Sequence, residues 1–356
     1  MRILVTGNMG YVGPRVVRQL RAAHPDAVLV GLDMGYFASV LSNAVIMPEC
    51  RVDLQYFADV RRPPREALQG VDVVVHLAAI SNDPMGHRFE RVTFAINHEA
   101  TVAFATLARA AGASSFVLAS SCSVYGAAGD APRDEQSAVA PLTAYSRSKI
   151  LAEQGLARLA GPGFTVTCLR FATACGMSER LRLDLVLNDF VAAAVSTKRV
   201  RILSDGTPWR PLIHVEDMAR AIEWAIRRDD GAGPFLAVNV GDDAWNYQVR
   251  ELAEAVAAVL PGIDVSVNTA AAADARSYRV SFAQFARLAP DHQPRRGLHD
   301  TIEELADGLE RMRFRDENFR ESAFVRLNVL SELRERGLLD DDLTWGAGVR
   351  APTTIS

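Results

Sequence analysis

The stretch RILVTGNMGYVGPRVVRQLRAA, residues 2–23, decides the fold. Its first residues, RILVT, are almost continuously apolar, which predicts a buried β-strand. The last ten, PRVVRQLRAA, repeat apolar residues at helical spacing. Between the two, Gly7, Gly10 and Gly13 allow a sharp turn from strand to helix. The stretch therefore predicts the opening strand, turn and helix of a parallel α/β sheet.

The same alternation continues along the first half of the chain. Apolar runs at 27–33, 71–79, 115–121 and 165–171 are separated by helical patterns. Runs of this kind are typical of parallel strands buried on both faces, so we expect a Rossmann-type, doubly wound sheet over residues 1–170. Beyond residue 171 helical patterns dominate, as in RELAEAVAAVLPG and DTIEELADGLERMRF.

The second half of the chain is expected to form a smaller, mostly helical region. We assign residues 171–210 and 243–300 to it, let 211–242 return to the sheet domain, and interpret 301–356 as a helical C-terminal extension. The alanine-rich NTAAAADA, residues 268–275, is interpreted as a loop.

Composition and charge narrow the classes of function that the chain could have. The 356 residues have a formal net charge of −4, no basic segment that would favour nucleic acid, and no apolar run of the roughly 20 residues that span a bilayer. The N-terminus lacks a signal-peptide pattern, so we expect a cytoplasmic protein without a membrane partner. Neither a disulfide framework nor a metal site is expected, because no CxxC spacing or histidine cluster joins Cys50, Cys122, Cys168 and Cys175.

The glycine-rich turn GNMGYVG has the chemistry of a dinucleotide site. Glycines permit a tight turn and a close approach of backbone to a pyrophosphate, and the helix that follows directs N–H groups at the phosphates. The spacing is GxxGxxG, which turn geometry alone could also explain. Asp33, about 20 residues further at a strand end, can accept hydrogen bonds from a ribose diol. Because no arginine follows it in residues 34–36, NAD is predicted rather than NADP.

A second motif, YSRSK, places Tyr145 and Lys149 four residues apart. On a helix the two side chains share a face. A tyrosine whose pKa falls from about 10 towards neutrality can act as a general base, and we expect Lys149 and a positive nicotinamide ring to lower that pKa. A surface tyrosine and lysine are the alternative for an isolated match.

Taken together, these residues resemble the extended short-chain dehydrogenases/reductases, in particular the nucleotide-sugar epimerases and dehydratases. The resemblance covers about residues 1–290. It rests on GNMGYVG, HLAA (76–79), INHEAT (96–101), SSCSVYG (120–126), YSRSK, LRFATACG (169–176) and DGTPWRPLIHVED (205–217).

The resemblance implies a set of contacts with the cofactor NAD. Asp59 and Val60 would flank the adenine, while Asn97 and Lys149 would hold the nicotinamide ribose. The full implied set is Gly7, Gly10, Tyr11, Val12, Gly13, Asp33, Asp59, Val60, Leu77, Ala78, Ala79, Asn97, Tyr145 and Lys149.

The resemblance further implies that Tyr145 is the general base and that Ser121 is the catalytic serine. Strand side chains alternate, so Ser121 and Ser123 are expected on one face and Cys122 in the core on the other. Family members that eliminate water carry an acid pair at the two positions after the Ser/Thr, which here are Cys122 and Ser123. Ser123 either binds substrate or is a structural hydroxyl.

The substrate-binding residues follow the same comparison. Arg210 matches the position that grips a nucleotide diphosphate, with a surface ion pair as the alternative. Thr173 stands where the family commonly has an asparagine that contacts the nucleotide. Asn188 and either Arg276 or Arg279 are candidates for further phosphate contacts, and Ser81 also belongs to the predicted substrate site. For His76, His87 and His214 we expect strand-end and capping roles.

The predicted function is that of an NAD-dependent nucleotide-sugar epimerase. Tyr145 would remove a proton from a sugar hydroxyl at C4 while Ser121 hydrogen-bonds the same oxygen, giving a transient ketone. A C4 dehydrogenase or ketoreductase is the alternative within the family, and a non-catalytic NAD-sensing protein is the alternative outside catalysis. The resemblance also implies a homodimer formed through the helix at 99–111 and the helix that carries Tyr145.

Overall fold

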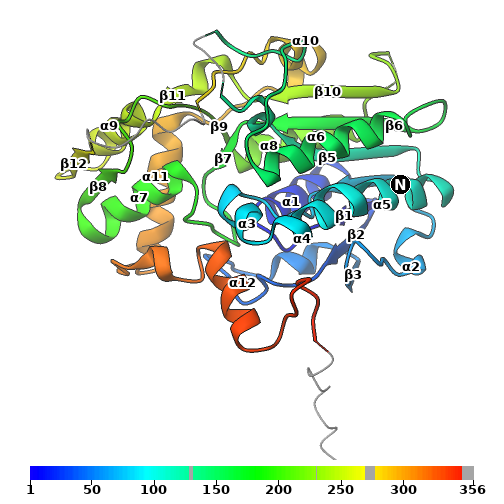
Figure 1. Ribbon diagram of the computed structural model, residues 1–356, viewed down its shortest axis with the longest axis horizontal. Helices are drawn as coiled ribbons and strands as arrows, with labels where there is room; N and C mark the ends of the chain where they lie inside the picture. The colour runs from blue at the N-terminus through cyan, green and yellow to red at the C-terminus, as the bar shows by residue number, and fades with distance from the viewer. Residues whose placement is uncertain (128–130, 230, 269–276, 347–356) are drawn as a thin grey trace, which may run out of the picture.

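A seven-stranded parallel sheet forms the centre of the protein (Figure 1), as a computed structural model of residues 1–127, 131–229, 231–268 and 277–346 shows. Every neighbouring pair is parallel, which confirms the predicted fold class. The strands, in spatial order, are β10 (Phe235–Val240), β6 (Thr165–Phe171), β5 (Ser115–Ser121), β4 (Val73–His76), β1 (Arg2–Thr6), β2 (Val28–Asp33) and β3 (Leu54–Phe57).

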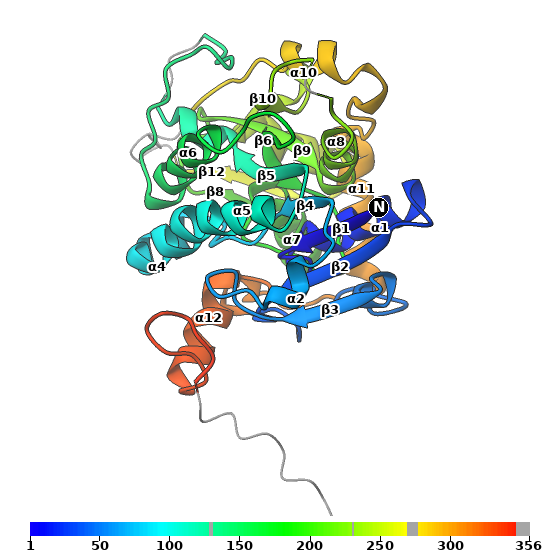
Figure 2. The ribbon, with the colours of Figure 1, turned by 90° about the vertical axis from the view of Figure 1, so that its right-hand side faces the viewer.

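Helices cover both faces of this sheet (Figure 2). α1 (Gly13–Ala23) and α8 (Val215–Ala225) pack together on one face. The other face carries the helices α3 (Asp83–Arg88), α4 (Glu90–Phe94), the π-helical turn Ala95–Ala100, α5 (Thr101–Ala110) and α6 (Ala144–Ala157). A short helix, α2 (Arg65–Leu68), precedes β4.

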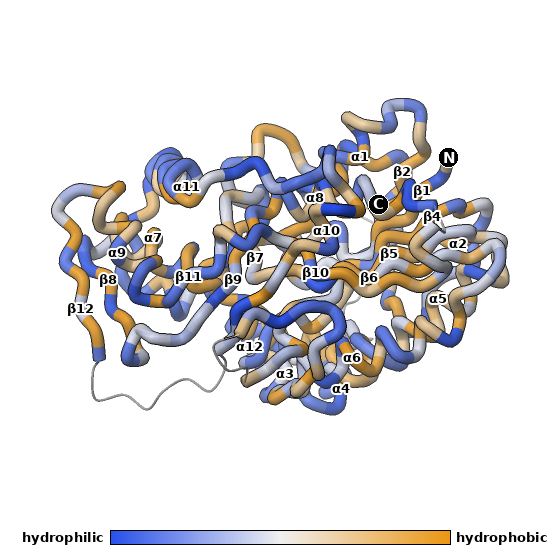
Figure 3. The backbone as a smooth tube through the Cα atoms, turned by 90° about the horizontal axis from the view of Figure 1, so that it is seen from above, coloured by the Kyte–Doolittle hydropathy of each residue, from blue (hydrophilic) through white to orange (hydrophobic). Residues whose placement is uncertain are grey.

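The two helical layers explain why the strands are continuously apolar. Ile3 and Val5 belong to the core that contains α1, whereas Leu4 belongs to the core that contains α5. All three are fully buried, so both faces of β1 need apolar side chains. The hydropathy colouring in Figure 3 shows the same for the central strands β5 and β6.

The second region is less helical than expected from the sequence. It has a sheet of β7 (Thr173–Cys175), β9 (Trp209–His214) and β11 (Asn246–Gln248), and a parallel pair of β8 (Arg199–Ile202) and β12 (Asp264–Val267). These strands are three to six residues long, too short to show a clear period in the sequence. Its longer helices are α7 (Val186–Thr197), α9 (Val249–Val259) and α11 (Leu298–Arg311), whereas α10 (Ala283–Leu288) lies beside β10 of the central sheet.

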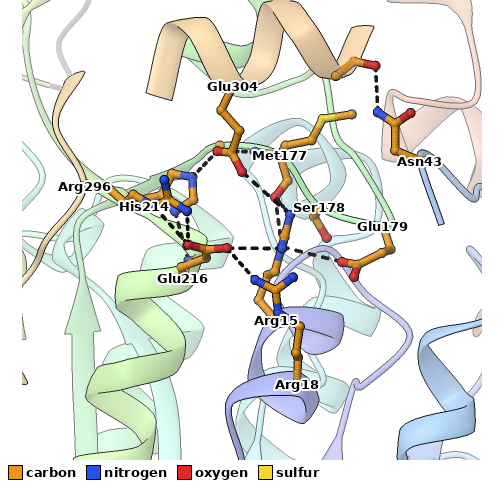
Figure 4. A network of polar contacts seen from close by, with 12 residues as sticks. Arg15, Arg18, Asn43, Met177, Ser178, Glu179, His214, Glu216, Arg296 and Glu304 are labelled. Atoms are coloured by element: carbon orange, nitrogen blue, oxygen red, sulfur yellow. Dashed lines mark hydrogen bonds and ion pairs between the residues drawn. The ribbon is translucent and has the colours of Figure 1, made fainter. Parts of the chain in front are cut away.

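A polar network joins α1, α8 and α11 (Figure 4). The Nδ1 atom of His214 accepts a hydrogen bond from the N–H of Glu216, and its Nε2 lies 2.6 Å from Glu304. Arg15 donates to the carbonyl of Met177 and to Glu216. His214 is therefore a helix-capping residue, and the network fixes the second region against the sheet domain.

The chain after α11 turns back to the N-terminal half. This C-terminal segment, residues 312–346, contains α12 (Arg326–Glu335), which lies on the β3 side of the sheet domain (Figures 1 and 2). The indole of Trp345 donates to the carbonyl of Met34, just after β2. Short 3-10 helices complete the structure: Pro48–Arg51, Cys122–Tyr125, Asp243–Trp245, Pro290–His292 and Phe319–Glu321. Within the described ranges, no helix is long and apolar enough to cross a membrane.

Candidate active site

A cavity of about 840 Å3 lies at the carboxyl ends of β1, β2, β4 and β5 and extends to the second region. This is the usual ligand position in a doubly wound sheet. Most of the residues predicted from the sequence line it: Gly7, Gly10, Tyr11, Val12, Gly13, Asp33, Asp59, Val60, Leu77, Ala78, Ala79, Ser81, Ser121, Ser123, Tyr145, Lys149, Thr173 and Arg210.

The glycine-rich turn forms one wall of the cavity. Gly7 has φ +73°, and a Cβ there would lie 2.6 Å from the backbone nitrogen of Ala78. A Cβ on Gly13 would lie 2.2 Å from the carbonyl oxygen of Asn8. Val12, the N-cap of α1, contributes no side-chain hydrogen bond to the first N–H groups of the helix. Pro14 has no N–H, and the N–H groups of Arg15 and Val16 donate to the carbonyl of Val12. Phosphate oxygens would therefore be bound by N–H groups of the turn that precedes them.

Asp33 is fixed beside this turn by two backbone donors. Its Oδ2 atom accepts from the N–H of Met9 at 3.0 Å, and its Oδ1 from the N–H of Gly35 at 2.7 Å. Burial raises the pKa of Asp33, and the two N–H donors act in the opposite direction. An anchored acceptor beside a phosphate-binding turn fits the adenosine ribose of NAD, so the chain provides the groups that this cofactor needs.

Ser121, Tyr145 and Lys149 line the same cavity. Ser121 ends β5, Tyr145 lies in the first turn of α6, and Lys149 follows one turn later. The Nζ atom of Lys149 donates to the carbonyl of Ala119 at 2.7 Å and lies 5.8 Å from the centre of the Tyr145 ring. Ser121 interacts with the Tyr145 hydroxyl in the direction that lowers the pKa of Tyr145. The predicted catalytic residues are thus brought together.

The pKa of Tyr145 differs from the sequence-based expectation. Burial raises it to about 12, against the opposing effect of Ser121. Burial also lowers the pKa of Lys149 to about 8, with Glu153 acting in the opposite direction. The protein chain by itself therefore does not bring the tyrosine near neutrality, because loss of solvation outweighs the nearby charge.

The residues after Ser121 lie where expected, but for a different reason. β5 ends at Ser121, and Cys122–Tyr125 forms a 3-10 helix. The N–H of Ser123, in the first turn of this helix, donates to the Ser121 Oγ. The Cys122 thiol is fully buried and donates to the carbonyl of Arg170. Burial raises its pKa, so it is a core thiol. Ser123 lines the cavity, and its Oγ is buried without a hydrogen-bond partner among the described residues.

Two predicted asparagines do not line the cavity. Asn97 exchanges hydrogen bonds with the backbone of Ile80, at 2.8 and 2.9 Å, and so fixes the loop after β4 instead of exposing its amide to a ribose. Asn188 donates to the Tyr11 hydroxyl and to the carbonyl of Arg182 and accepts from the N–H of Gly176. Both amides are buried, and the hydrogen bonds assigned to ligand are made within the protein.

The predicted arginines differ in their position relative to the cavity. Arg210 lines the cavity on β9. Arg279 lies outside its lining and stacks over the Trp209 ring at 4.8 Å, which makes it a packing residue in this structure. Arg276 and most of the predicted 268–275 loop lie outside the described residues.

A charged pair that sequence reasoning missed also lines the cavity. The guanidinium of Arg182 bonds Asp184 at 2.8 and 3.0 Å and donates to the Ser81 hydroxyl at 2.9 Å. The amide of Asn82 donates to Asp184 at 2.7 Å. Burial opposes the charge of Asp184, yet Arg182 keeps its pKa low. The alternation of charge and leucine in ERLRLDL, residues 179–185, is the signal that could have pointed to it. Arg320 and Arg326 of the C-terminal segment were also missed.

The fold and the cavity define a dinucleotide-binding protein with the serine, tyrosine and lysine of a short-chain dehydrogenase. More particularly, the chain belongs to the NAD-dependent epimerase/dehydratase family, whose model matches residues 3–241. Family membership confirms the sequence-based assignment and makes NAD the cofactor.

Curated relatives carry out different reactions of this family. The chain is 30% identical to the dTDP-glucose 4,6-dehydratase of Streptomyces griseus, over 69% of this chain and 76% of that protein. It is 28% identical to the UDP-glucose 4-epimerase of Streptomyces lividans, over 72% and 80%. Among solved structures, MoeE5 in complex with UDP-glucose and NAD matches with a TM-score of 0.74 and 26% identity, over 88% and 99% of the two chains.

Proposed function

We propose that this protein is an NAD-dependent nucleotide-sugar 4-epimerase that acts by transient oxidation of a sugar hydroxyl. Three observations support the proposal. Ser121, Tyr145 and Lys149 line one cavity with the glycine-rich turn. The same cavity continues to Arg210 in the second region, where there is room for a nucleotide diphosphate. Several relatives at 26–28% identity are UDP-glucose 4-epimerases.

Each residue of the triad has a distinct task. Tyr145 accepts the proton of the sugar hydroxyl, and Ser121 hydrogen-bonds the same oxygen and orients it. Lys149 carries positive charge close to Tyr145 and favours the phenolate. Bound NAD supplies the electron-pair acceptor and donor, and its positive ring adds to the effect of Lys149. Since burial raises the pKa of Tyr145 to about 12, proton removal depends on these neighbouring charges.

The observation that favours epimerisation over dehydration is the chemistry at the two positions after Ser121. Elimination of water needs an acid that protonates a leaving hydroxyl. Cys122 is buried outside the cavity lining with a raised pKa, and Ser123, which lines the cavity, is a serine with a buried Oγ. These two positions therefore provide no carboxylic acid, whereas reversible oxidation needs only the residues already in place.

The substrate is a nucleotide-diphosphate sugar. The Arg210 guanidinium suits a diphosphate, and Ser81, Ser123 and Thr173 line the same cavity as candidates for contacts with the sugar and its phosphates. MoeE5, a similar structure, is a complex with UDP-glucose. UDP-sugars are for that reason the first candidates to test.

Mass spectrometry and NMR of a nucleotide-sugar panel test the proposal. The NAD-loaded protein should convert at least one sugar into a C4 epimer of unchanged mass. Tyr145→Phe, which retains the ring but removes the base, is the matched control and should give no product. A product that has lost water would indicate a dehydratase, and one that has lost two hydrogens with reduction of NAD would indicate the dehydrogenase; either result would replace the epimerase proposal. Absence of any conversion across the panel would favour the NAD-sensing alternative.

A further inference from the structure

Arg326 is a buried arginine that the triad and the predicted site do not use. It is the first residue of α12, in the C-terminal segment, and only 1% of it is exposed. One guanidinium nitrogen donates to the carbonyl of Arg180 at 2.7 Å. The guanidinium carbon lies 4.4 Å from the centre of the Phe37 ring, in the loop after β2. The side chain lines the same cavity as the glycine-rich turn.

The positive charge of Arg326 is not matched by a carboxylate of its own. Its Nη1 atom is buried without a hydrogen-bond partner in the part of the chain that the structure describes. The neighbouring Asp184 is already bonded to Arg182 through both carboxylate oxygens. Burial lowers the pKa of Arg326 to about 9, and the charge of Arg182 adds to the effect. A buried cation with a hydrogen-bond donor that has no acceptor destabilises the fold, unless an anion binds and accepts that hydrogen bond.

Three other cations that line the cavity have partners. Lys149 donates to a backbone carbonyl, Arg182 pairs with Asp184, and Arg320 pairs with Asp189 at 2.7 Å. The glycine-rich turn offers N–H groups but no positive side chain. A diphosphate bound at this turn would carry two negative charges. The turn alone provides no cation to pair with them.

We propose that Arg326 binds the diphosphate of NAD, so that the C-terminal segment completes the cofactor site. Two sources of a diphosphate share this cavity, the cofactor and the nucleotide sugar. The cofactor is favoured because Phe37, on which Arg326 stacks, follows Asp33 by four residues. The same segment contacts that loop again, where Trp345 donates to the carbonyl of Met34 and packs beside Tyr36. The inference rests on NAD dependence, not on epimerisation.

Calorimetric titration of variants with NAD, ADP and adenosine tests the proposal. Arg326→Gln should weaken binding of NAD and of ADP at least tenfold, the scale for a lost charge-assisted hydrogen bond, and leave adenosine affinity unchanged. Arg326→Lys should recover part of the loss. Arg334→Gln is the matched control, because it removes a guanidinium from the same helix outside the cavity lining, and its NAD affinity should equal that of the wild type.

Three results would overturn the proposal. Unchanged NAD affinity in folded Arg326→Gln would remove it. An equal loss for adenosine would mean that Arg326 only shapes the adenosine pocket. A loss for UDP with NAD unaffected would assign the arginine to the substrate diphosphate. If Arg326→Gln does not fold, hydrogen exchange of residues 319–335 in the wild type decides: NAD and ADP should slow it and adenosine should not, and equal protection by adenosine would contradict the assignment.

Discussion

Replacing Lys149 by methionine should make the protein more stable at pH 7 while abolishing activity. The ammonium is almost fully buried, and burial lowers its pKa from 10.5 to about 8. Each pKa unit corresponds to ~1.36 kcal/mol, so the difference of ~2.5 units corresponds to about 3 kcal/mol. Below pH 8, where Lys149 is charged in the folded protein, the free energy of unfolding is lower by this amount. Methionine avoids this cost and fills a similar volume.

The hydrogen bond from Lys149 to the carbonyl of Ala119 reduces the expected gain. Losing it costs about 1 kcal/mol, so the free energy of unfolding should rise by about 2 kcal/mol at pH 7. Between pH 8 and pH 10.5 the unfolded chain binds more protons than the folded one at this site, so wild-type stability rises with pH. At pH 10 the advantage of methionine should therefore fall to about zero.

Urea unfolding of the nucleotide-free wild type and variant at pH 7 and pH 10 measures this difference. Lys198→Met is the control, because Lys198 is the other lysine of the chain and is exposed. It should change stability little at either pH. Destabilisation of Lys149→Met at pH 7, or an equal gain at both pH values, would show that burial of charge is not what sets the energy of this site.

Three further predictions concern the cofactor, the base and the assembly. NAD should bind at least tenfold more tightly than NADP, and Asp33→Ala should erode that preference; tighter NADP binding in calorimetry would contradict the role of the carboxylate. Tyr145→Phe should retain NAD binding and lower turnover at least 100-fold. Cys122→Ala should change turnover less than threefold. A folded but inactive Cys122→Ala variant would refute the assignment of Cys122 to the core. Leu107 on α5 and Leu151 on α6 are 48% and 36% exposed, so a homodimer of twice the 38.7 kDa chain should appear in light scattering, and a monomer at micromolar concentration would rule it out.

Much of the sheet domain follows from local sequence. Strands such as β1 and β5 are buried on both faces, and an apolar run is the direct consequence of that position. β3 could not be predicted in this way, because Leu54 and Phe57 are exposed at the edge of the sheet. The glycine-rich turn and Asp33 were equally accessible, since their spacing reflects one local strand-turn-helix unit.

The parts of the site that depend on distant contacts were not accessible. Asn97 and Asn188 were assigned to ligand, yet a sequence does not show that Ile80 and Tyr11 already use their amides. Arg326 lies about 300 residues after the glycine-rich turn with which it lines one cavity, and no periodic pattern connects the two. Ser121 and Ser123 line the cavity and Cys122 is buried, but the strand alternation on which that prediction was based ends at Ser121, where a 3-10 helix begins.

The central claim, epimerisation by transient oxidation, is tested most directly by running the reaction in deuterium oxide. If Tyr145 and Ser121 act on a hydroxyl and the carbon-bound hydrogen is returned without meeting solvent, the product should contain no deuterium at the inverted carbon. No net reduction of NAD should remain at completion. NMR and mass spectrometry of the product provide both readings. Deuterium at the inverted carbon would contradict the account, because it would show that the hydrogen leaves as a proton and exchanges with water.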